Sequence, residues 1–331
     1  MKKIFSGKLI IFLTGLICFS SVWGSGSPAL ADDLKFGPWI NLYNFYDVCY
    51  LEGKAWAVGN YGHIIFSDDG GKVWTRQESG VDMELYAVWF VTAQDGWVFG
   101  RAGLVLKTSD GGETWVKQDL NTDLDINACF FLDENTAWIV GAMNMVLYTG
   151  DGGKTWTRRS GDEDMILNGV YFCDQDFGWA VGEFGGILHT QDGGRTWEKQ
   201  THPCGEGSLF DVYFLNRNRG WVTGVDGVIL GTNDGGATWI LEKSHSKENL
   251  FRIRRAGNKM FVAGFKGSLL VNRDIEKAKA SWDAVSIGCY FWFRGISFMD
   301  ANTGILAGGN GNIFYTKDGG GSWNLAELLK Y

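Results

Sequence analysis

Three arginines stand close together in an otherwise apolar stretch, Phe251-Arg-Ile-Arg-Arg-Ala256. Arginine forms paired, charge-assisted hydrogen bonds with carboxylates, so this cluster could hold an acidic peptide or another carboxylate-bearing ligand. The alternative is structural, because the same arginines could form salt bridges within the chain. The candidate partners for such bridges are Asp47, Asp211, Glu183 and Asp226. The sequence leaves both interpretations open.

Two glycine-rich motifs resemble ligand-binding loops, but their spacing is wrong. Gly153-Lys154-Thr155 matches the end of a phosphate-binding loop, yet Tyr148 stands where that loop needs its first glycine. Asp68-Asp69-Gly70-Gly71 resembles the start of a calcium loop, but the alternating oxygen ligands and the distal glutamate do not follow. The histidines are scattered and no Cys-x-x-Cys pair occurs, so zinc spacing is missing as well. We therefore predict neither a metal nor a cofactor.

The Asp-Gly-Gly motif at residues 69–71 recurs along the chain because it belongs to a repeat that ends in tryptophan. Tryptophan returns every 41 to 43 residues and usually closes a phrase such as Thr190-Gln-Asp-Gly-Gly-Arg-Thr-Trp197. A repeat of this length indicates a propeller or another array of identical units. The seven positions are Trp74, Trp115, Trp156, Trp197, Trp239, Trp282 and Trp323.

Each repeat contains the pattern of four short strands. Between Trp115 and Trp156, apolar runs cover residues 127–132, 136–141 and 145–149, and each is bounded by Gly, Asn or Asp. Together with the strand that begins at the tryptophan, they make one antiparallel blade. The sequence thus predicts an all-β fold, a seven-bladed β-propeller of four-stranded antiparallel blades. We expect the segment after Trp323 to complete the seventh blade and an N-terminal strand at residues 39–42 to seal its edge.

The Asp-Gly-Gly phrase is the Asp-box, or BNR, motif, and its residue types suit a tight turn. Aspartate accepts hydrogen bonds from nearby backbone N–H groups, and glycine adopts positive φ without a steric clash. A seventh copy, from Asn272 to Trp282, lacks the glycines and is three residues longer. We interpret the six regular aspartates as scaffold: Asp69, Asp110, Asp151, Asp192, Asp234 and Asp318.

Strand direction predicts which face of the propeller can bind a partner. The connector into the first strand and the loop between the second and third strands share a face, whereas the Asp-boxes lie on the opposite face. The first face should therefore collect basic and aromatic side chains, with the Asp-boxes remote from the partner. Our candidate partner-binding residues are Arg101, Arg252, Arg254, Lys266, Arg294, Tyr46, Tyr86, Phe210 and Trp292, with Phe251 beside them.

The first 31 residues have the pattern of a secretory signal peptide, with a basic start, an apolar run from Leu9 and Ala29-Leu30-Ala31 before the expected cleavage. Residues 32–331 would then form one exported domain. The formal net charge is -8, and loss of three lysines with the signal would make it -11, which argues against a nucleic-acid or anionic-membrane binder. A disulfide between Cys204 and Cys289 remains open.

The seven Trp-Ala-Val-Gly and Asp-Gly-Gly-x-Thr-Trp units behind a signal resemble the photosystem II stability/assembly factor family, over about residues 36–328. The resemblance implies a non-enzymatic assembly factor that binds a newly made membrane subunit through an arginine-rich patch, for which Arg252, Arg254 and Arg294 are the candidates here. We also expect a monomer that is peripheral to the membrane at most. The location would be the periplasm, or the thylakoid lumen if the host is photosynthetic.

The competing interpretation is an Asp-box glycoside hydrolase, sialidase-like or glucan-active. Phe251-Arg-Ile-Arg254 resembles the Phe/Tyr-Arg-Ile-Pro motif of sialidases, but Arg254 replaces the proline and the chain has seven repeats where sialidases have six blades. Glucan-active relatives place two propellers across a cleft, and this chain has room for one. A third interpretation, a surface adhesin, differs in location alone.

Overall fold

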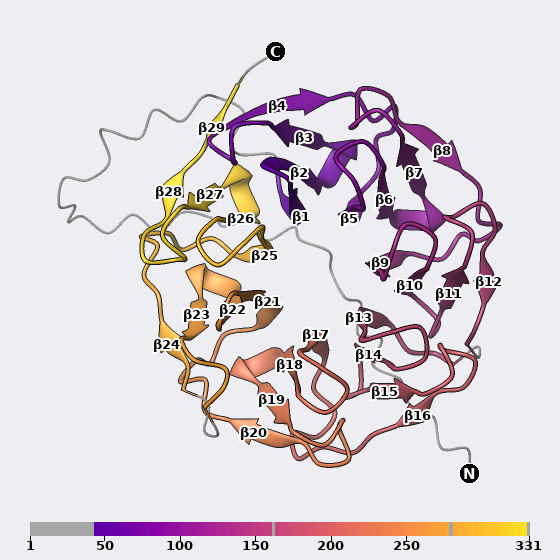
Figure 1. The fold of residues 1–331 in the computed structure, drawn as a ribbon, viewed down its shortest axis with the longest axis vertical. Coiled ribbons are helices and arrows are strands. Elements are labelled where there is room, and N and C mark those ends of the chain that lie inside the picture. Colours follow the sequence, from indigo (N-terminus) through magenta and orange to yellow (C-terminus); the bar gives the residue numbers. More distant parts are fainter. Residues whose placement is uncertain (1–42, 161–162, 278–280, 330–331) are drawn as a thin grey trace, which may run out of the picture. The chain divides into compact units, whose positions relative to one another are not determined.

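The computed structural model describes residues 43–160, 163–277 and 281–329. These residues form seven sheets arranged as the blades of a ring (Figure 1). Each blade runs from an inner strand at the central channel to a short strand at the outer edge of the propeller. The four strands of a blade pair with their neighbours in antiparallel fashion. The prediction of a seven-bladed propeller is confirmed. Within the described part of the chain, no helix is long and apolar enough to cross a membrane.

The strands of the first four blades follow one another in chain order. Blade 1 contains β1 (Phe45–Leu51), β2 (Lys54–Gly59), β3 (Ile64–Ser67) and β4 (Val73–Gln77). Blade 2 contains β5 (Leu85–Phe90), β6 (Gly96–Gly100), β7 (Val105–Thr108) and β8 (Val116–Gln118). Blade 3 contains β9 (Ile126–Phe131), β10 (Ala137–Gly141), β11 (Val146–Thr149) and β12 (Thr157–Arg158). Blade 4 contains β13 (Leu167–Phe172), β14 (Gly178–Gly182), β15 (Ile187–Thr190) and β16 (Glu198–Lys199).

The remaining blades repeat the same order. Blade 5 contains β17 (Leu209–Phe214), β18 (Gly220–Gly224), β19 (Ile229–Thr232) and β20 (Ile240–Glu242). Blade 6 contains β21 (Leu250–Ala256), β22 (Lys259–Gly264), β23 (Leu269–Asn272) and β24 (Asp283–Ala284). Blade 7 contains β25 (Phe293–Phe298), β26 (Gly304–Gly308), β27 (Ile313–Thr316) and β28 (Asn324–Leu325). Short 3-10 turns follow the second strand in five blades: η1 (Asn60–Gly62), η2 (Arg101–Gly103), η3 (Val225–Gly227), η4 (Phe265–Gly267) and η5 (Gly309–Gly311).

The core lies between adjacent blades, where large aromatic side chains interleave. Trp56 of β2 stacks on Phe90 of the next blade, with ring centroids 3.6 Å apart, and Trp138 stacks on Phe172 at the same distance. The indole of Trp56 also donates a hydrogen bond of 2.9 Å to the carbonyl of Gly111 in the neighbouring Asp-box. Because both aromatic partners are almost fully buried, each such pair contributes on the order of 3–6 kcal/mol of apolar burial.

The Asp-box turns have a regular hydrogen-bond pattern. In blade 2, the Asp110 carboxylate accepts bonds from the Thr108 hydroxyl at 2.7 Å and from the backbone N–H and hydroxyl of Thr114. These bonds lower the pKa of Asp110 to about 2, and the equivalent bonds do the same for Asp151 and Asp318. The N–H of Gly111 bonds to the carbonyl of Gln94 in the turn between β5 and β6, which places the Asp-box on the face away from the turn between the second and third strands.

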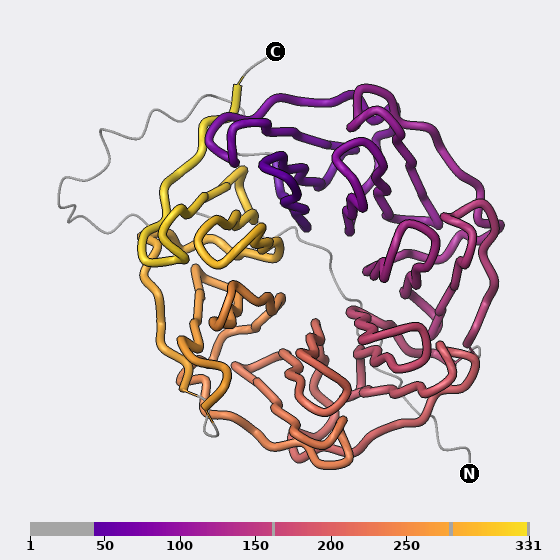
Figure 2. The backbone as a smooth tube through the Cα atoms, in the orientation of Figure 1, coloured from indigo at the N-terminus to yellow at the C-terminus, as the bar shows by residue number. Residues whose placement is uncertain are grey.

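The ring closes at the junction of blades 7 and 1, which lie side by side in Figure 2. β28 pairs with β27, so residues after Trp323 complete blade 7 locally, as expected. A further strand, β29 (Glu327–Leu328), then pairs in parallel with β4, at Val73 and Trp74. This attachment of the C-terminal segment to blade 1 was not predicted. The expected N-terminal strand at residues 39–42 lies outside the described residues.

Candidate functional site: the channel mouth

A β-bulge in every inner strand brings seven side chains to one mouth of the channel. In each blade the register skips the second residue of the inner strand, as at Tyr46 between Phe45 and Asp47. A bulge leaves the extra residue unpaired and re-aims its side chain. The bulged residues are Tyr46, Tyr86, Asn127, Asn168, Phe210, Phe251 and Arg294. We call this set the mouth ring.

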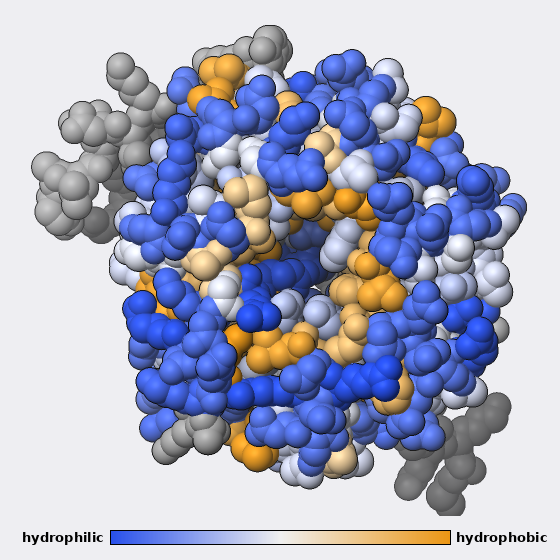
Figure 3. Space-filling view, in the orientation of Figure 1, coloured by the Kyte–Doolittle hydropathy of each residue, from blue (hydrophilic) through white to orange (hydrophobic). Residues whose placement is uncertain are grey.

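The glycine that ends each second strand allows the bulge to pack closely. A Cβ atom at Gly59 would stand 1.9 Å from the carbonyl oxygen of Asn44, and one at Gly141 would stand 1.9 Å from that of Asp125. The Trp-Ala-Val-Gly phrase therefore ends in glycine because the chain entering the inner strand crosses directly over it. The centre of the ring is hollowed, and both hydrophilic and hydrophobic residues surround the opening (Figure 3).

Arg294 lies among aromatic rings on one side of the mouth ring. Its guanidinium lies 5.9 Å from the ring centroid of Tyr46, which stacks on Trp292 with an interplanar angle of 8° and contacts Tyr86. No carboxylate of the described residues forms a salt bridge with Arg294. Burial and the nearby guanidinium of Arg252 lower the pKa of Arg294 from its usual value, although the Asp47 carboxylate acts in the opposite direction. A bound anion would stabilise the charged form of Arg294.

Arg252 lies deeper, in a buried ionic network. Its guanidinium is 2.7 Å from the Asp47 carboxylate and 3.9 Å from that of Asp211, and its Nε donates to the Arg294 carbonyl. Burial acts to lower the pKa of Arg252, but Asp47 and Asp211 offset this and raise it above the usual value. Both carboxylates also accept a backbone N–H of the following blade, from Val88 and Ile253.

The other four basic candidates of the sequence analysis all have acidic partners: Arg101, Arg252, Arg254 and Lys266. Arg254 lies two residues beyond Arg252 along β21, toward the Asp-box face, and its Nη1 is 2.6 Å from Asp211. Arg101 pairs with Glu84 at 3.2 Å, and Lys266 pairs with Glu248 at 3.0 Å, both at the exposed rim. The structural interpretation of the arginine cluster therefore holds for Arg252 and Arg254, and they do not form an open patch with Arg294.

An exposed rim surrounds the mouth ring and consists of the connections between second and third strands. Each connection has one non-glycine residue with a left-handed backbone, with φ between 51° and 59°, and that of blade 3 has a second, Asn144, with φ of 50°. Tyr61 and Phe184 hold this conformation and expose 52% and 56% of their surface. Bulky residues rarely adopt positive φ, and such conformations persist where the surroundings enforce them. The remaining members of this set are Ala102, Met143, Asp226, Lys266 and Asn310.

The sequence placed most of the mouth ring correctly but missed its two amides. Tyr46, Tyr86, Phe210, Phe251 and Arg294 meet at the mouth, with Trp292 beside them. The amides of Asn127 and Asn168 donate to the carbonyls of Leu167 and Leu209 on the next inner strand. Alignment of the repeats on the residue before each Asp47 equivalent would have found them. The five cysteines of the described chain are free, so Cys204 and Cys289 form no disulfide.

Comparison with known proteins identifies the family. The family model described as Photosynthesis system II assembly factor YCF48 matches residues 31–109, 74–163, 109–203 and 160–240. These ranges overlap as successive repeats and end before Arg252 and Arg294. A search of curated proteins found no match.

Solved structures show the same fold at low sequence identity. A structure titled "YCF48 bound to D1 peptide" is 20% identical, with a TM-score of 0.60, over 73% of this chain and 81% of that one. YCF48 from Cyanidioschyzon merolae is 16% identical, with a TM-score of 0.68, over 83% and 95%. A GH74 xyloglucanase from Xanthomonas campestris is 11% identical, with a TM-score of 0.71, over 86% of this chain and 55% of that one. The match of the family model over more than half of the sequence shows that this chain belongs to the YCF48 family of photosystem II assembly factors.

Proposed function

We propose that the chain is an exported, non-enzymatic propeller that binds a peptide segment of a membrane protein at the mouth ring and assists assembly or stability of a membrane complex. The observation that carries this proposal is Arg294, a partly buried cation without a carboxylate partner among the described residues, beside the stacked Tyr46 and Trp292. An acidic side chain or a terminal carboxylate of the peptide would complete its coordination.

Two further observations support a peptide ligand. The exposed aromatic and apolar residues at the rim, including Tyr61, Met143 and Phe184, offer contact area around the polar centre of the mouth. A solved structure with the same fold is titled "YCF48 bound to D1 peptide", and it supports a peptide ligand for this chain. If the host is photosynthetic, a D1-type subunit in the thylakoid lumen is the corresponding partner. In another host, a periplasmic complex takes its place.

Glycoside hydrolysis has less support at this site. A glycosidase needs two carboxyl groups available to the substrate as acid and base or nucleophile. The two carboxylates on the inner strands of the described blades, Asp47 and Asp211, are buried and bound to Arg252, Arg254 and backbone N–H groups. Turnover of a xyloglucan or sialoside panel by the purified protein would contradict the proposal.

The test is recovery of a membrane-protein partner from solubilised membranes on the immobilised protein. Arg294→Gln should lower recovery by about tenfold or more, because the ligand carboxylate would lose its charged partner. Arg273→Gln is the matched control, since Arg273 is an exposed arginine on blade 6 that pairs with Asp283. Equal recovery with Arg294→Gln and wild type would contradict the assignment of the mouth ring.

Export is tested separately. The mature protein recovered from the cell envelope should begin at Asp32, as shown by N-terminal sequencing. A protein found in the cytoplasm with residues 1–31 intact would contradict the exported location and leave the peptide-binding assignment unaffected. We also propose that the mature protein is a monomer, to be checked by light scattering.

A further inference from the structure

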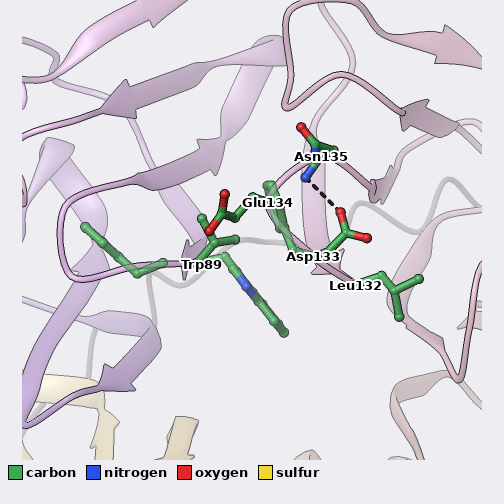
Figure 4. Close-up of a pocket in the computed structure, with 8 residues that line it drawn as sticks. Trp89, Leu132, Asp133, Glu134 and Asn135 are labelled. Atoms are coloured by element: carbon green, nitrogen blue, oxygen red, sulfur yellow. Dashed lines mark hydrogen bonds between the residues drawn. The ribbon is translucent and has the colours of Figure 1, made fainter.

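A second cavity opens at the other end of the inner strands, on the Asp-box face between blades 2 and 3. Its volume is about 490 Å³, and its walls include Trp89, Phe90, Phe131 and Leu132. The turn between β9 and β10 contributes Asp133 and Glu134. Figure 4 shows Glu134 beside Trp89, whereas Asp133 turns toward Asn135, whose N–H it binds at 2.8 Å. Glu134 is exposed and forms no salt bridge with a described residue.

An aromatic arc leads away from this cavity along the channel wall. Trp89, Phe130, Tyr171 and Tyr213 belong to four consecutive blades, and successive ring centroids are 5.6, 4.8 and 4.9 Å apart. All four rings are only partly buried. Electron-rich ring faces next to an uncompensated carboxylate attract cations.

Blade 5 carries a cation, Arg217, at the repeat position that Glu134 holds in blade 3. The Arg217 guanidinium lies 3.9 Å from the centroid of Phe177 and its Nε is 2.6 Å from the Asp174 carboxylate, both in the turn between β13 and β14. At this position the chain therefore places a cation of its own against an acid and an aromatic ring of the preceding blade. In blade 3 the same position is an acid, and no cation of the described residues lies over the Trp89 ring.

We propose that the cavity between blades 2 and 3 binds a basic side chain of a partner protein, a guanidinium or ammonium group that stacks on Trp89 and pairs with Glu134. This site lies on the face opposite the mouth ring and does not depend on the function proposed for that ring. A propeller with both sites holds an acidic segment at one face and a basic segment at the other.

The test uses the peptide acetyl-Gly-Arg-Gly-amide as the probe and the indole N–H resonance of Trp89 in the ¹⁵N-labelled protein as the signal. The probe should shift this resonance in a saturable manner. The analogue with citrulline in place of arginine has nearly the same shape without the charge and should bind about tenfold more weakly. Glu134→Gln should weaken the arginine peptide about threefold, as expected for an exposed ion pair.

Two further variants make the test decisive. Glu134→Arg introduces the residue type of blade 5 and should abolish binding, because the introduced positive charge would repel the arginine of the probe. Glu198→Gln, on the exposed outer strand of blade 4, should bind the arginine peptide as wild type does. The proposal is overturned if the Trp89 resonance does not respond to the arginine peptide, if citrulline binds equally well, or if cellotetraose gives an equal or stronger response. Arg294→Gln should leave this binding unchanged, which separates the two sites.

Discussion

Blades 3 and 6 show two ways of holding the same fold together. Blade 3 follows the regular repeat, with an Asp-box whose Asp151 binds Thr149 and Thr155 and whose bonds lie within a few residues of one another. Blade 6 lacks the glycines of the motif and carries Arg252 and Arg254 on its inner strand. Its contacts reach instead to Asp211 in blade 5 and Asp47 in blade 1.

Near the outer strands, a second long-range contact replaces the hydrogen bond that the irregular turn of blade 6 lacks. In the regular case, the indole of Trp138 donates to the carbonyl of Gly193 in the next Asp-box. Blade 6 has no such glycine, and the Glu242 carboxylate of blade 5 accepts the indoles of both Trp221 and Trp282, at 3.1 and 2.7 Å. Where the local turn is lost, ionic and carboxylate contacts between blades replace it.

The largest effect is expected when the network of blade 6 is broken at its centre. Arg252→Ala would leave Asp47 without its salt bridge in a buried site, and we expect unfolding free energy to fall by about 3–5 kcal/mol in urea denaturation. Arg273→Ala, which removes an exposed pair, should change it by less than about 1 kcal/mol. Equal effects of the two variants would show that blade 6 does not depend on its long-range contacts.

A smaller loss is expected at the outer contact of the same blade. Glu242→Gln retains one carbonyl oxygen, so one of the two indole N–H groups would lose its partner at a cost of about 1–2 kcal/mol. The reciprocal change in blade 4, Gln200→Glu, would place a carboxylate against the carbonyl of Gly235, which the Gln200 amide now binds at 2.9 Å. Both variants should lower the denaturation midpoint. A stabilised Glu242→Gln protein would contradict the role given to this carboxylate.

The smallest effects concern pH and should have opposite signs in the two kinds of blade. Burial raises the pKa of Glu242, so its ionisation disfavours the fold and its contribution declines as pH rises through that raised pKa. Hydrogen bonds lower the pKa of Asp151 to about 2, so its contribution is complete above about pH 4 and is lost as pH falls toward 2.

Thermal unfolding across pH 2–7 tests this difference in sign. Asp151→Asn should flatten the loss of stability on the acid side, whereas Glu242→Gln should remove a decline that appears as pH rises above about 4. Parallel pH profiles for the two variants would show that the regular and irregular blades respond alike to protons.

The sequence predicted blade number, strand order and the face of the Asp-boxes because these follow from local spacing that recurs in every repeat. It could not decide how Arg252 is used, because that depends on which side chains meet across the channel. The signal was present in part: Asp47, Asp211 and Arg252 occupy one repeat position where the other blades have Ala or Gly. Their joint departure from the repeat marked the network. Only the ring geometry shows that the inner strand of blade 7 packs closely on that of blade 1 at Gly295, and that Arg252 of blade 6 reaches the Asp47 carboxylate.

The aromatic cavity near Trp89 was missed for a different reason. Its side chains belong to the end of β5 and to the turn after β9, and their types are ordinary for a propeller core. The distinguishing feature of this cavity is that Glu134 occupies the repeat position at which blade 5 has Arg217. A single exposed charge does not indicate a binding site until the structure shows the open space beside it.

The parallel pairing of β29 with β4 has a consequence for the order of events during synthesis. The strands of blade 1 come first in the chain, but the backbone groups on the outer edge of β4 pair with Glu327 and Leu328, which come almost last. Until these residues have paired, β4 is an open strand edge that could template pairing with another chain. Closing the seam therefore sets the time for which a nascent copy is vulnerable to aggregation, and a partner that covers β4 in that interval would act as a folding aid.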